Sequence, residues 1–306
     1  MSDLLLVDIG GTNIRYAYAK CGDSEIYDPK KVSLANLDNF EDIINDLISK
    51  TDLNITNIVF SIAGPKVGNS ISMTNRSFTA NADLIKDKFK LKQCHLLNDW
   101  ESIGYSLDCT PEDKIDYLKD GTSVNSNSLV IGPGTGLGAA FIMKNSVTAT
   151  EIGNTTNWTS SLLNNFNISD AEQFSSLEDI LSGTGISKLY KSETGIYISA
   201  VEIIKKYYKD DIPAVNVING FIKCLAFVLS DAALTYIPGN GIFLAGGLSR
   251  SLLPIIDKEL FTNFFLENKS SIHKDLLRKI KIGVITRELT CLYGNLNYFK
   301  LYNSIN

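Results

Sequence analysis

The sequence has few of the residues that build metal sites. Its 306 residues include five cysteines and two histidines, and no two cysteines have the CxxC spacing. A zinc site made of cysteine and histidine is therefore not expected. Scattered cysteines are typical of free thiols in a reducing compartment, so the sequence predicts a cytoplasmic protein.

Positive charge and long apolar runs are scarce as well. Lysine and arginine total 29 against 34 aspartates and glutamates, which gives a net charge of −5. Because nucleic-acid phosphates are bound by basic surfaces, we expect no nucleic-acid partner. The most apolar stretch, 221–237, contains Lys223 and Asp231 and is shorter than the ~20 residues of a membrane-spanning helix. Residues 1–11 lack the basic leader of a secretory signal, so we expect no membrane partner and a buried helix at 221–237.

The composition is that of a folded protein with more than one domain. The chain is 44% hydrophobic and 21% charged, which provides enough apolar residues for a sizeable core. At about 150 residues per domain, this length predicts roughly two domains. Residues 109–128 are polar and turn-rich, which makes them the best candidate for a domain junction or a long loop.

Two segments share the order of a short apolar strand, a glycine-rich turn and a second strand. The first turn is 10–13 and the second is 132–138. This order is typical of β-hairpins. The turns begin 122 residues apart (132 − 10 = 122), so we expect two similar α/β halves. The flanking strands are expected at 4–9, 14–19, 129–131 and 139–143.

A third glycine turn, at 246–247, follows a strand expected at 241–245. Turns of this kind bind phosphate, because their N–H groups approach an anion without a Cβ in the way. The sequence has no GxxxxGK[ST] motif, which excludes a P-loop. The GxGxxA spacing that begins at Gly134 fits a dinucleotide fingerprint. However, a strand is expected directly after it, where that fingerprint needs a helix.

Asp8 stands at the end of the first apolar strand, directly before its glycine turn. A buried carboxylate is costly unless it is paired or bound to a metal. Two interpretations stay open. Asp8 either accepts hydrogen bonds from backbone amides of the turn, or it holds Mg²⁺ through water, since this ion keeps several waters and bridges to phosphates. Thr12 and Asn13 add polar side chains at the same turn.

Five motifs occur in order along the chain: DIGGTN (8–13), LLNDW (96–100), GPGTGLG (132–138), LSGTG (181–185) and FLAGG (243–247). Together with residues 61–78, they resemble the bacterial glucokinases. The implied fold is the two-domain α/β fold of hexokinase/actin-like (ribonuclease H-like) sugar kinases, in which the domains close over a cleft. The resemblance places residues 1–108 plus about 288–306 in a small domain and 109–287 in a large domain.

The resemblance also implies the nucleotide site. It implies that ATP and Mg²⁺ are bound, with Asp8 positioning the metal ion and its water. The residues implied to face the transferred phosphoryl group are Gly10, Gly11, Thr12 and Asn13. Those implied to hold the other phosphates are Gly134, Thr135 and Gly136, with Gly246 and Gly247 against the adenosine.

The implied reaction is phosphorylation of glucose at its 6-hydroxyl, with Asp99 as the general base. A positioned carboxylate can accept the proton of a hydroxyl that attacks the γ-phosphoryl group. The local pattern alone fits equally well an Asp99 that caps the following helix. The sugar-binding residues implied by the resemblance are Asn98, Asp99, Glu151, Asn154, Glu178 and Asn75.

The sugar loop departs from the family, which usually carries Glu-Gly-Gly-His where residues 151–154 read Glu-Ile-Gly-Asn. Asn154 can donate and accept hydrogen bonds, but its reach differs from that of histidine. Two alternatives therefore stay open: a kinase of another hexose or amino sugar with the same fold, and a catalytically weakened sugar sensor. Glu178 also fits the pattern of a solvated carboxylate on a helix, and its neighbour Asp179 is a competing candidate for the sugar-binding role. Asn75 also fits the pattern of a residue that stabilises a turn. Because similar kinases are commonly dimeric, a homodimer is expected.

Overall fold

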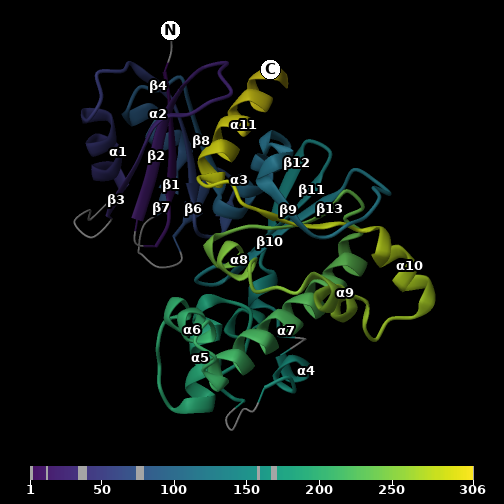
Figure 1. The fold of residues 1–306 in the computed structure, drawn as a ribbon. Helices are drawn as coiled ribbons and strands as arrows, with labels where there is room; N and C mark the ends of the chain where they lie inside the picture. Colours follow the sequence, from purple (N-terminus) through teal and green to yellow (C-terminus); the bar gives the residue numbers. More distant parts are fainter. Residues whose placement is uncertain are drawn as a thin grey trace. The chain divides into compact units, whose positions relative to one another are not determined.

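The computed structural model describes residues 3–11, 13–33, 40–73, 79–156, 159–166 and 171–305. The chain divides into two compact units, which are drawn in Figure 1. Unit 1 contains residues 1–110 and 287–306, and unit 2 contains residues 111–286. Each unit combines a sheet with helices, so the predicted α/β class is confirmed.

Unit 1 is built on a five-stranded sheet. In spatial order its strands are β3 (Tyr27–Ser33), β2 (Asn13–Lys20), β1 (Asp3–Ile9), β4 (Ile55–Ile62) and β8 (Gln93–Asn98). The predicted first hairpin is confirmed, because β1 and β2 pair antiparallel from Asp3↔Lys20 to Ile9↔Ile14. Strands β1, β4 and β8 run parallel, so their carboxyl ends lie at the same edge of the sheet.

The remaining elements of unit 1 are helices and a small antiparallel sheet. One helix follows each of the strands β3, β7 and β8, and a long helix comes last in this unit. These helices are α1 (Phe40–Ser49), α2 (Ala82–Lys88), α3 (Asp99–Ser106), the 3₁₀ turn η1 (Leu107–Cys109) and α11 (Thr290–Ile305). The small sheet contains β5 (Lys66–Val67), β6 (Ser70–Ser72) and β7 (Thr79–Asn81).

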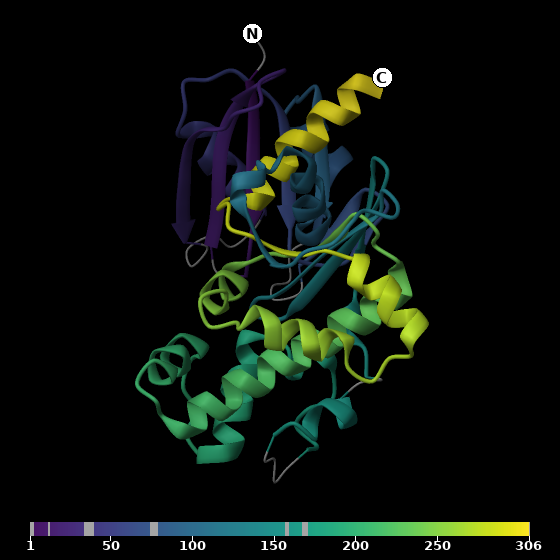
Figure 2. The ribbon, with the colours of Figure 1, turned by 45° about the vertical axis from the view of Figure 1, so that its right-hand side comes forward.

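Helices cover both faces of the unit 1 sheet (Figures 1 and 2). Leu4 and Leu6 of β1 pack in one cluster with apolar residues of α11. Leu5 and Val7 pack in another cluster with residues of α1 and α2. Because successive side chains of a strand point to opposite faces, Asp8 lies on the face that α11 covers.

Unit 2 is built on a six-stranded sheet. In spatial order its strands are β12 (Ser146–Thr150), β11 (Leu137–Met143), β10 (Ser128–Pro133), β13 (Gly241–Leu244), β14 (Ile282–Ile285) and β9 (Ile115–Lys119). The second predicted hairpin is confirmed by the antiparallel pairing of β10 with β11. A strand follows its glycine turn, which excludes the dinucleotide fingerprint. Strands β10 and β13 run parallel.

Strand β9 was missed by the sequence analysis, since it lies inside the polar segment 109–128. It pairs antiparallel with β14 at the edge of the unit 2 sheet. Strand β9 is short and lies at the edge of the sheet. Two of its five residues, Asp116 and Lys119, are charged. The apolar pattern is therefore too short to reveal it. The chain passes from unit 1 to unit 2 between residues 110 and 111.

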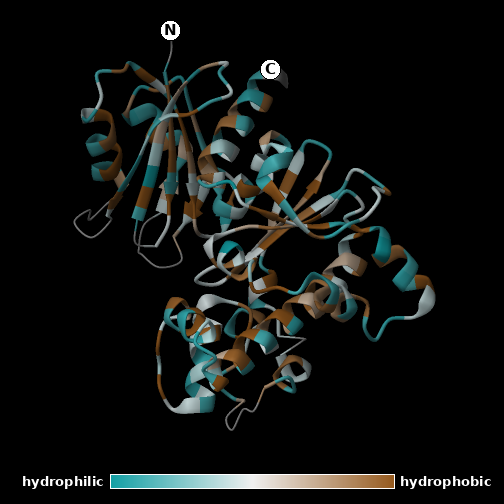
Figure 3. Ribbon diagram, viewed as in Figure 1, coloured by the Kyte–Doolittle hydropathy of each residue, from teal (hydrophilic) through white to brown (hydrophobic). Residues whose placement is uncertain are grey.

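Helices and 3₁₀ turns make up the rest of unit 2. Hydrophobic residues concentrate on its strands and its long central helix (Figure 3). The elements are η2 (Glu112–Lys114), η3 (Ile152–Asn154), α4 (Thr159–Leu163), η4 (Leu177–Asp179), α5 (Gly183–Thr194), α6 (Ala200–Tyr207), α7 (Ile212–Tyr236), α8 (Gly247–Leu252), α9 (Lys258–Leu266) and α10 (Ser271–Lys279).

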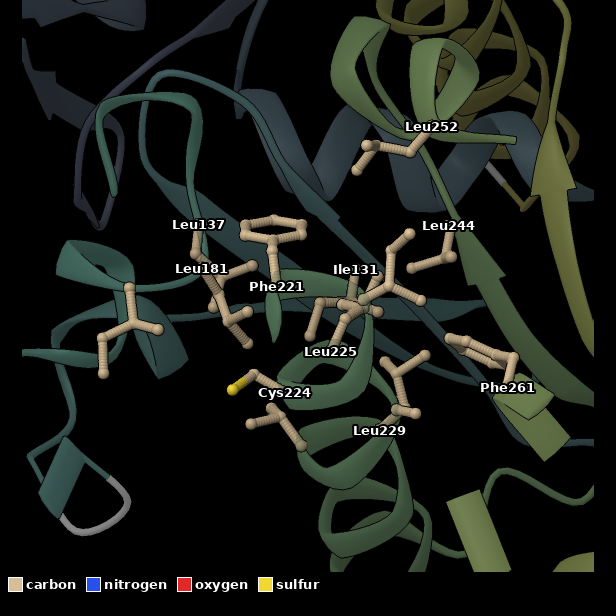
Figure 4. Close-up of a cluster of buried hydrophobic side chains, with 14 of the residues drawn as sticks. Ile131, Leu137, Leu181, Phe221, Cys224, Leu225, Leu229, Leu244, Leu252 and Phe261 are labelled. Atoms are coloured by element: carbon tan, nitrogen blue, oxygen red, sulfur yellow. The ribbon is translucent and has the colours of Figure 1, made fainter. Parts of the chain in front are cut away.

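Helix α7 contains the apolar stretch 221–237 and is the central core helix of unit 2, as predicted. Within the described part of the chain, it is the one helix long and apolar enough to cross a membrane, and its buried side chains belong to the unit 2 core. Figure 4 shows Phe221 of α7 beside Leu137 and Leu181. Since Leu137 directly follows the glycine turn of the hairpin, the core anchors that turn.

Candidate functional site

The predicted site residues of unit 1 gather at the carboxyl ends of parallel strands. Asp8 and the glycine turn end β1, and Asn98 and Asp99 lie where β8 ends and α3 begins. Strand β4 lies between them and ends before Gly64. In α/β sheets, ligands bind outside the carboxyl ends of the strands. The structure thus brings Asp8, Asn98 and Asp99 to one sheet edge.

Asp8 is a buried carboxylate that is paired across the sheet. It lies opposite Arg15 on β2 and opposite Ser61 on β4. Its Oδ2 accepts a hydrogen bond from Arg15 Nη1 at 3.2 Å, and its Oδ1 accepts one from Ser61 Oγ at 3.3 Å. Burial raises the pKa of Asp8, and the Arg15 guanidinium opposes this shift. Side chains on neighbouring strands therefore partner this group in the described part of the chain.

The turn after Asp8 closes through its backbone. Gly10 N donates to Asn13 O at 3.0 Å, and Asn13 begins β2. A Cβ on Gly10 would lie in ordinary contact with Asn13 O, at 3.5 Å. Without that Cβ, an anion can approach the backbone amides of the turn closely. Of the other predicted residues, Gly11 lies in this turn, and Thr12 lies outside the described residues.

Asn98, not Asp99, caps helix α3. Asn98 Oδ1 accepts hydrogen bonds from Trp100 N at 2.8 Å and Glu101 N at 3.3 Å. Its Nδ2 donates to Gly64 O at 2.9 Å, which ties the end of β8 to the segment after β4. The interpretation of Asp99 as the helix cap is therefore wrong. Only the second hydrogen of the Asn98 amide is left for a sugar hydroxyl, so its role in sugar binding stays a prediction.

Asp99 is the first residue of α3 and is half-buried. Its Oδ1 accepts a hydrogen bond from Trp100 N at 3.0 Å. A helix N-terminus carries partial positive charge, which favours a negatively charged side chain there. The position of Asp99 at the sheet edge suits a group that accepts a proton. The other sugar residue predicted in unit 1, Asn75, lies outside the described residues.

The glycine turn of unit 2 is fixed to the start of α5. Gly134 N donates to Gly136 O at 2.7 Å, which closes the turn. Gly183 N donates to Gly134 O at 2.8 Å, and Thr184 Oγ1 donates to Thr135 O at 2.9 Å. The LSGTG motif thus contributes to the same site as the GPGTGLG motif by anchoring its backbone.

Gly246 and Gly247 lie at the carboxyl end of β13, the parallel neighbour of β10. Gly246 has a φ of 103°, a conformation that side chains rarely adopt, and Gly247 begins α8. Because β10 and β13 end at the same edge, both glycine turns of unit 2 lie at that edge. This places the two groups of predicted nucleotide residues of unit 2 on neighbouring strands.

Glu178 contacts the glycine turn of unit 2 directly. Its Oε2 accepts a hydrogen bond from Leu137 N at 3.2 Å. A Cβ on Gly136 would lie 2.4 Å from the same oxygen, and one on Gly153 would lie 3.3 Å from it. Glu178 is therefore not a solvated helix carboxylate. The competing Asp179 forms an ion pair with Lys188 at 2.5 Å.

Glu151 and Asn154 form a pair in the sugar loop. Asn154 Nδ2 donates to Glu151 Oε2 at 3.0 Å, and η3 joins the two residues. Gly153 in the same loop approaches Leu137, since a Cβ there would lie 2.2 Å from Leu137 O. The sugar loop, Glu178 and the glycine turn consequently form one connected group in unit 2.

Three contributors to unit 1 were missed: Arg15, Ser61 and Asn295. The register of the first hairpin contains a signal for Arg15, because a turn at 10–13 places residue 15 opposite residue 8. No local signal exists for Ser61 or Asn295, which lie 53 and 287 residues after Asp8 (61 − 8; 295 − 8). No group of three or more potential metal ligands occurs among the described residues.

In unit 1, one sheet edge carries two carboxylates, which suits the acceptance of a proton. In unit 2, two glycine turns at one sheet edge suit the binding of phosphates. The fold agrees. A solved glucokinase from an Antarctic psychrotroph has a TM-score of 0.81 at 23% identity, covering 98% of this chain and 99% of that one. A glucokinase of the ROK family from Streptomyces griseus, in complex with glucose and AMPPNP, has a TM-score of 0.65 at 16% identity, covering 97% and 99%.

The glucokinase family model matches residues 5–301, so the chain belongs to the glucokinase family of sugar kinases. The predicted resemblance is confirmed. Among curated relatives, a glucokinase of Mesorhizobium japonicum is 27% identical over 307 aligned positions, covering 95% of this chain and 89% of the relative. At this identity, the family is defined but the sugar is not.

Proposed function

We propose that this protein transfers the γ-phosphoryl group of ATP to the 6-hydroxyl of glucose. The observation that carries the proposal is the position of Asp8 and Asp99 at the carboxyl ends of two parallel strands of one sheet. The family and the glucokinase names of its relatives support glucose as the substrate. The glucose and AMPPNP of the Streptomyces griseus structure support the sugar and the nucleotide.

Asp99 acts as the general base. Its carboxylate accepts the proton of the 6-hydroxyl while the hydroxyl oxygen attacks the γ-phosphorus and the bond to the ADP oxygen breaks. A positioned base contributes about 10²–10⁴-fold to such a step. The N-terminus of α3 carries partial positive charge, which favours a negatively charged side chain at this position. Hydroxyl groups of the sugar are bound by the side chains of Asn98, Glu151, Asn154, Glu178 and Asn75.

The glycine turns bind the nucleotide. Gly10, Gly11, Thr12 and Asn13 contact the transferred phosphoryl group. Backbone amides hold phosphates where no Cβ intervenes. The other phosphates and the adenosine are bound by Gly134, Thr135, Gly136, Gly246 and Gly247.

Asp8 fits a magnesium ion held through water. Carboxylate oxygens are the ligands that Mg²⁺ prefers, and this ion keeps several waters when phosphates supply the rest. A single buried carboxylate meets that need, whereas a cage of protein ligands does not exist among the described residues. When bound, the ion neutralises charge on the phosphates. Arg15, which contacts Asp8, supplies a second positive charge at this place.

A kinase of another hexose or of an amino sugar is the second candidate. The observation that favours it is the hydrogen bond from Asn154 to Glu151, in a loop where the family usually carries histidine. Sites built to hydrogen-bond one hydroxyl pattern discriminate strongly against others. Specificity constants for glucose, mannose, fructose, glucosamine and N-acetylmannosamine, measured with Mg-ATP by coupled ADP release, decide between the two.

The test of the base role compares two aspartates near the same helix. Asp99→Asn should lower kcat by about 10²–10⁴-fold with little change in the KM for sugar. Asp108→Asn, an exposed neighbour on η1, should retain parental kinetics. If Asp99→Asn were as fast as the parent, the assignment of the base would be abandoned. Absence of ADP release with every sugar would contradict the kinase activity itself.

A further inference from the structure

Asn295 forms a polar contact inside an apolar interface. It lies on α11 and is fully buried among leucine and phenylalanine side chains that pack on the sheet. Its Nδ2 donates to Val7 O at 3.0 Å, and its second hydrogen lies between Ser61 Oγ at 3.3 Å and Val59 O at 3.4 Å. Its Oδ1 lies 2.8 Å from Ser102 Oγ and shares the single hydrogen of this hydroxyl with Cys291 O, which lies 2.7 Å from the same oxygen. A buried amide is tolerated only when it is bonded in this way, so the site is built around it.

Each of the two serines next to Asn295 is connected to one carboxylate of the site. Ser61 donates to Asp8 Oδ1 at 3.3 Å. Ser102 lies on α3, three residues after Asp99. Helix α11 also contacts Asp99 through Cys291, one turn before Asn295, since Cys291 Sγ donates to the Asp99 carbonyl oxygen at 3.8 Å. One face of α11 therefore contacts the supports of both carboxylates.

The amide also decides where the Ser61 hydrogen points. Ser61 Oγ has two acceptors at 3.3 Å, Val7 O and Asp8 Oδ1, and only one hydrogen to donate. Asn295 supplies Val7 O with another donor and gives Ser61 Oγ an incoming hydrogen bond. The Ser61 hydrogen is thereby left for the carboxylate of Asp8.

Helix α3 has no freedom to shift on α11 at this point. A Cβ on Gly294 would lie 1.8 Å from Ser102 O, so the two helix backbones touch beside Asn295. Asn295 joins α3 to the sheet edge here, through Ser102 on one side and through β1 and β4 on the other, next to the bonds of Cys291 and Asn297 between the same two helices.

We propose that Asn295 is a positioning residue for phosphoryl transfer. Through Ser61 it orients Asp8, and through Ser102 it fixes the start of α3, which carries Asp99. The inference rests on the proposed kinase function. Because it concerns the alignment of the two carboxylates rather than the binding of either substrate, loss of Asn295 should lower kcat more than it raises the KM for sugar or ATP.

The first test compares two asparagines of α11. Asn295→Leu removes the link, whereas Asn297→Leu removes a bond of 2.8 Å to Tyr105 O, another tie between α11 and α3. We expect Asn295→Leu to lose about tenfold or more in kcat, the effect of one hydrogen bond to a charged group, and Asn297→Leu to keep the parental value. Equal losses in both variants would mean that weakening any contact between the two helices lowers kcat. That result would overturn the proposal.

The second test uses serines, which remain informative if Asn295→Leu does not fold. Ser61→Ala should lower kcat about tenfold as well. Its control is Ser106→Ala on α3, since Ser106 is buried but donates only to Ile103 O within its own helix, at 2.7 Å. The double variant Ser61→Ala/Asn295→Leu should be no slower than Asn295→Leu alone. Multiplied losses, or a parental kcat in Ser61→Ala, would contradict the proposal.

A readout without catalysis separates this inference from the proposed function. If the parent phosphorylates no sugar, the kinase function fails, and the Asp8 carboxyl carbon is then titrated by NMR. Asn295→Leu and Ser61→Ala must raise the pKa of Asp8 above that of the parent, and Asn297→Leu must not. Arg15 and Cys291, the other groups against Asp8, are unchanged in all of these variants. Identical pKa values would overturn the inference.

Discussion

Replacing His95 with phenylalanine should make unit 1 less sensitive to acid. His95 lies on β8, and its ring packs against three aromatic rings of α11 at centroid distances of 5.4, 6.3 and 4.4 Å. Its Nε2 is buried without a hydrogen-bond partner among the described residues. Burial, with smaller effects of Lys66 and Lys86, lowers the pKa of His95 to about 4. The folded protein therefore excludes a proton that the unfolded chain accepts.

The size of the effect follows from linkage. The ordinary pKa of histidine is 6.5, so the contribution of His95 to the free energy of unfolding is complete above pH 6.5 and is lost as the pH falls toward 4. Between about pH 7 and about pH 4.5, the linkage relation gives a loss of about 2 kcal/mol from this residue. A phenylalanine ring fills nearly the same space and binds no proton.

The assay is urea unfolding at these two pH values, followed by tryptophan fluorescence. The chain has two tryptophans, and Trp100 lies on α3 in unit 1, so a Trp158→Phe background makes the signal report unit 1 alone. The control is His273→Phe, which alters the other histidine, an exposed residue of α10 in unit 2. On acidification, the parent and His273→Phe should each lose about 2 kcal/mol more than His95→Phe.

Two results would refute the reasoning. One is an equal loss of unfolding free energy on acidification in the parent and in His95→Phe. The other is an NMR titration of the His95 ring with a midpoint at the ordinary value of 6.5 rather than near 4. Either would show that the α11 rings do not exclude the proton.

Two glycine substitutions test the close contacts at the sites. Gly136→Ala would put a methyl group 2.4 Å from Glu178 Oε2, so we expect a higher KM for sugar in a steady-state assay. The control is Gly134→Ala, whose methyl group would have its nearest neighbour at 3.9 Å and which should keep the parental KM for sugar. Gly294→Ala would place a methyl group 1.8 Å from Ser102 O, which should destabilise unit 1 by about 1–3 kcal/mol in urea unfolding; an unchanged midpoint would show that α11 does not touch α3 here.

The parts of the fold that the sequence predicts are those with a strong local pattern. The two glycine hairpins were predicted because an apolar run, a glycine turn and a second run are adjacent in the chain. Strand β9 could not, because an edge strand with Asp116 and Lys119 has too few apolar positions to show a period.

The parts of the site that the sequence does not predict are held by partners distant in the chain. Ser61 reaches Asp8 because β4 is the parallel neighbour of β1, a fact of sheet order that no local pattern contains. The other inward residues of α11 are apolar. In such a helix an asparagine is ordinarily assigned to the exposed face, so the sequence alone does not distinguish Asn295 from a surface residue. Its bonds to Ser61 and Ser102 appear only when α11 is packed on the sheet.

The two hairpins use the same framework for different chemistry. In unit 1, the pair next to the turn-closing pair Ile9↔Ile14 is Asp8↔Arg15. In unit 2, the pair next to the closing pair Pro133↔Leu137 is Gly132↔Gly138. A charged pair places fixed charges beside the turn, whereas a glycine pair leaves its surroundings clear of side chains. Under the proposed function, this difference of two residues per hairpin gives the turn of unit 1 a charged partner for the metal ion, while the turns of both units bind phosphates through their backbone.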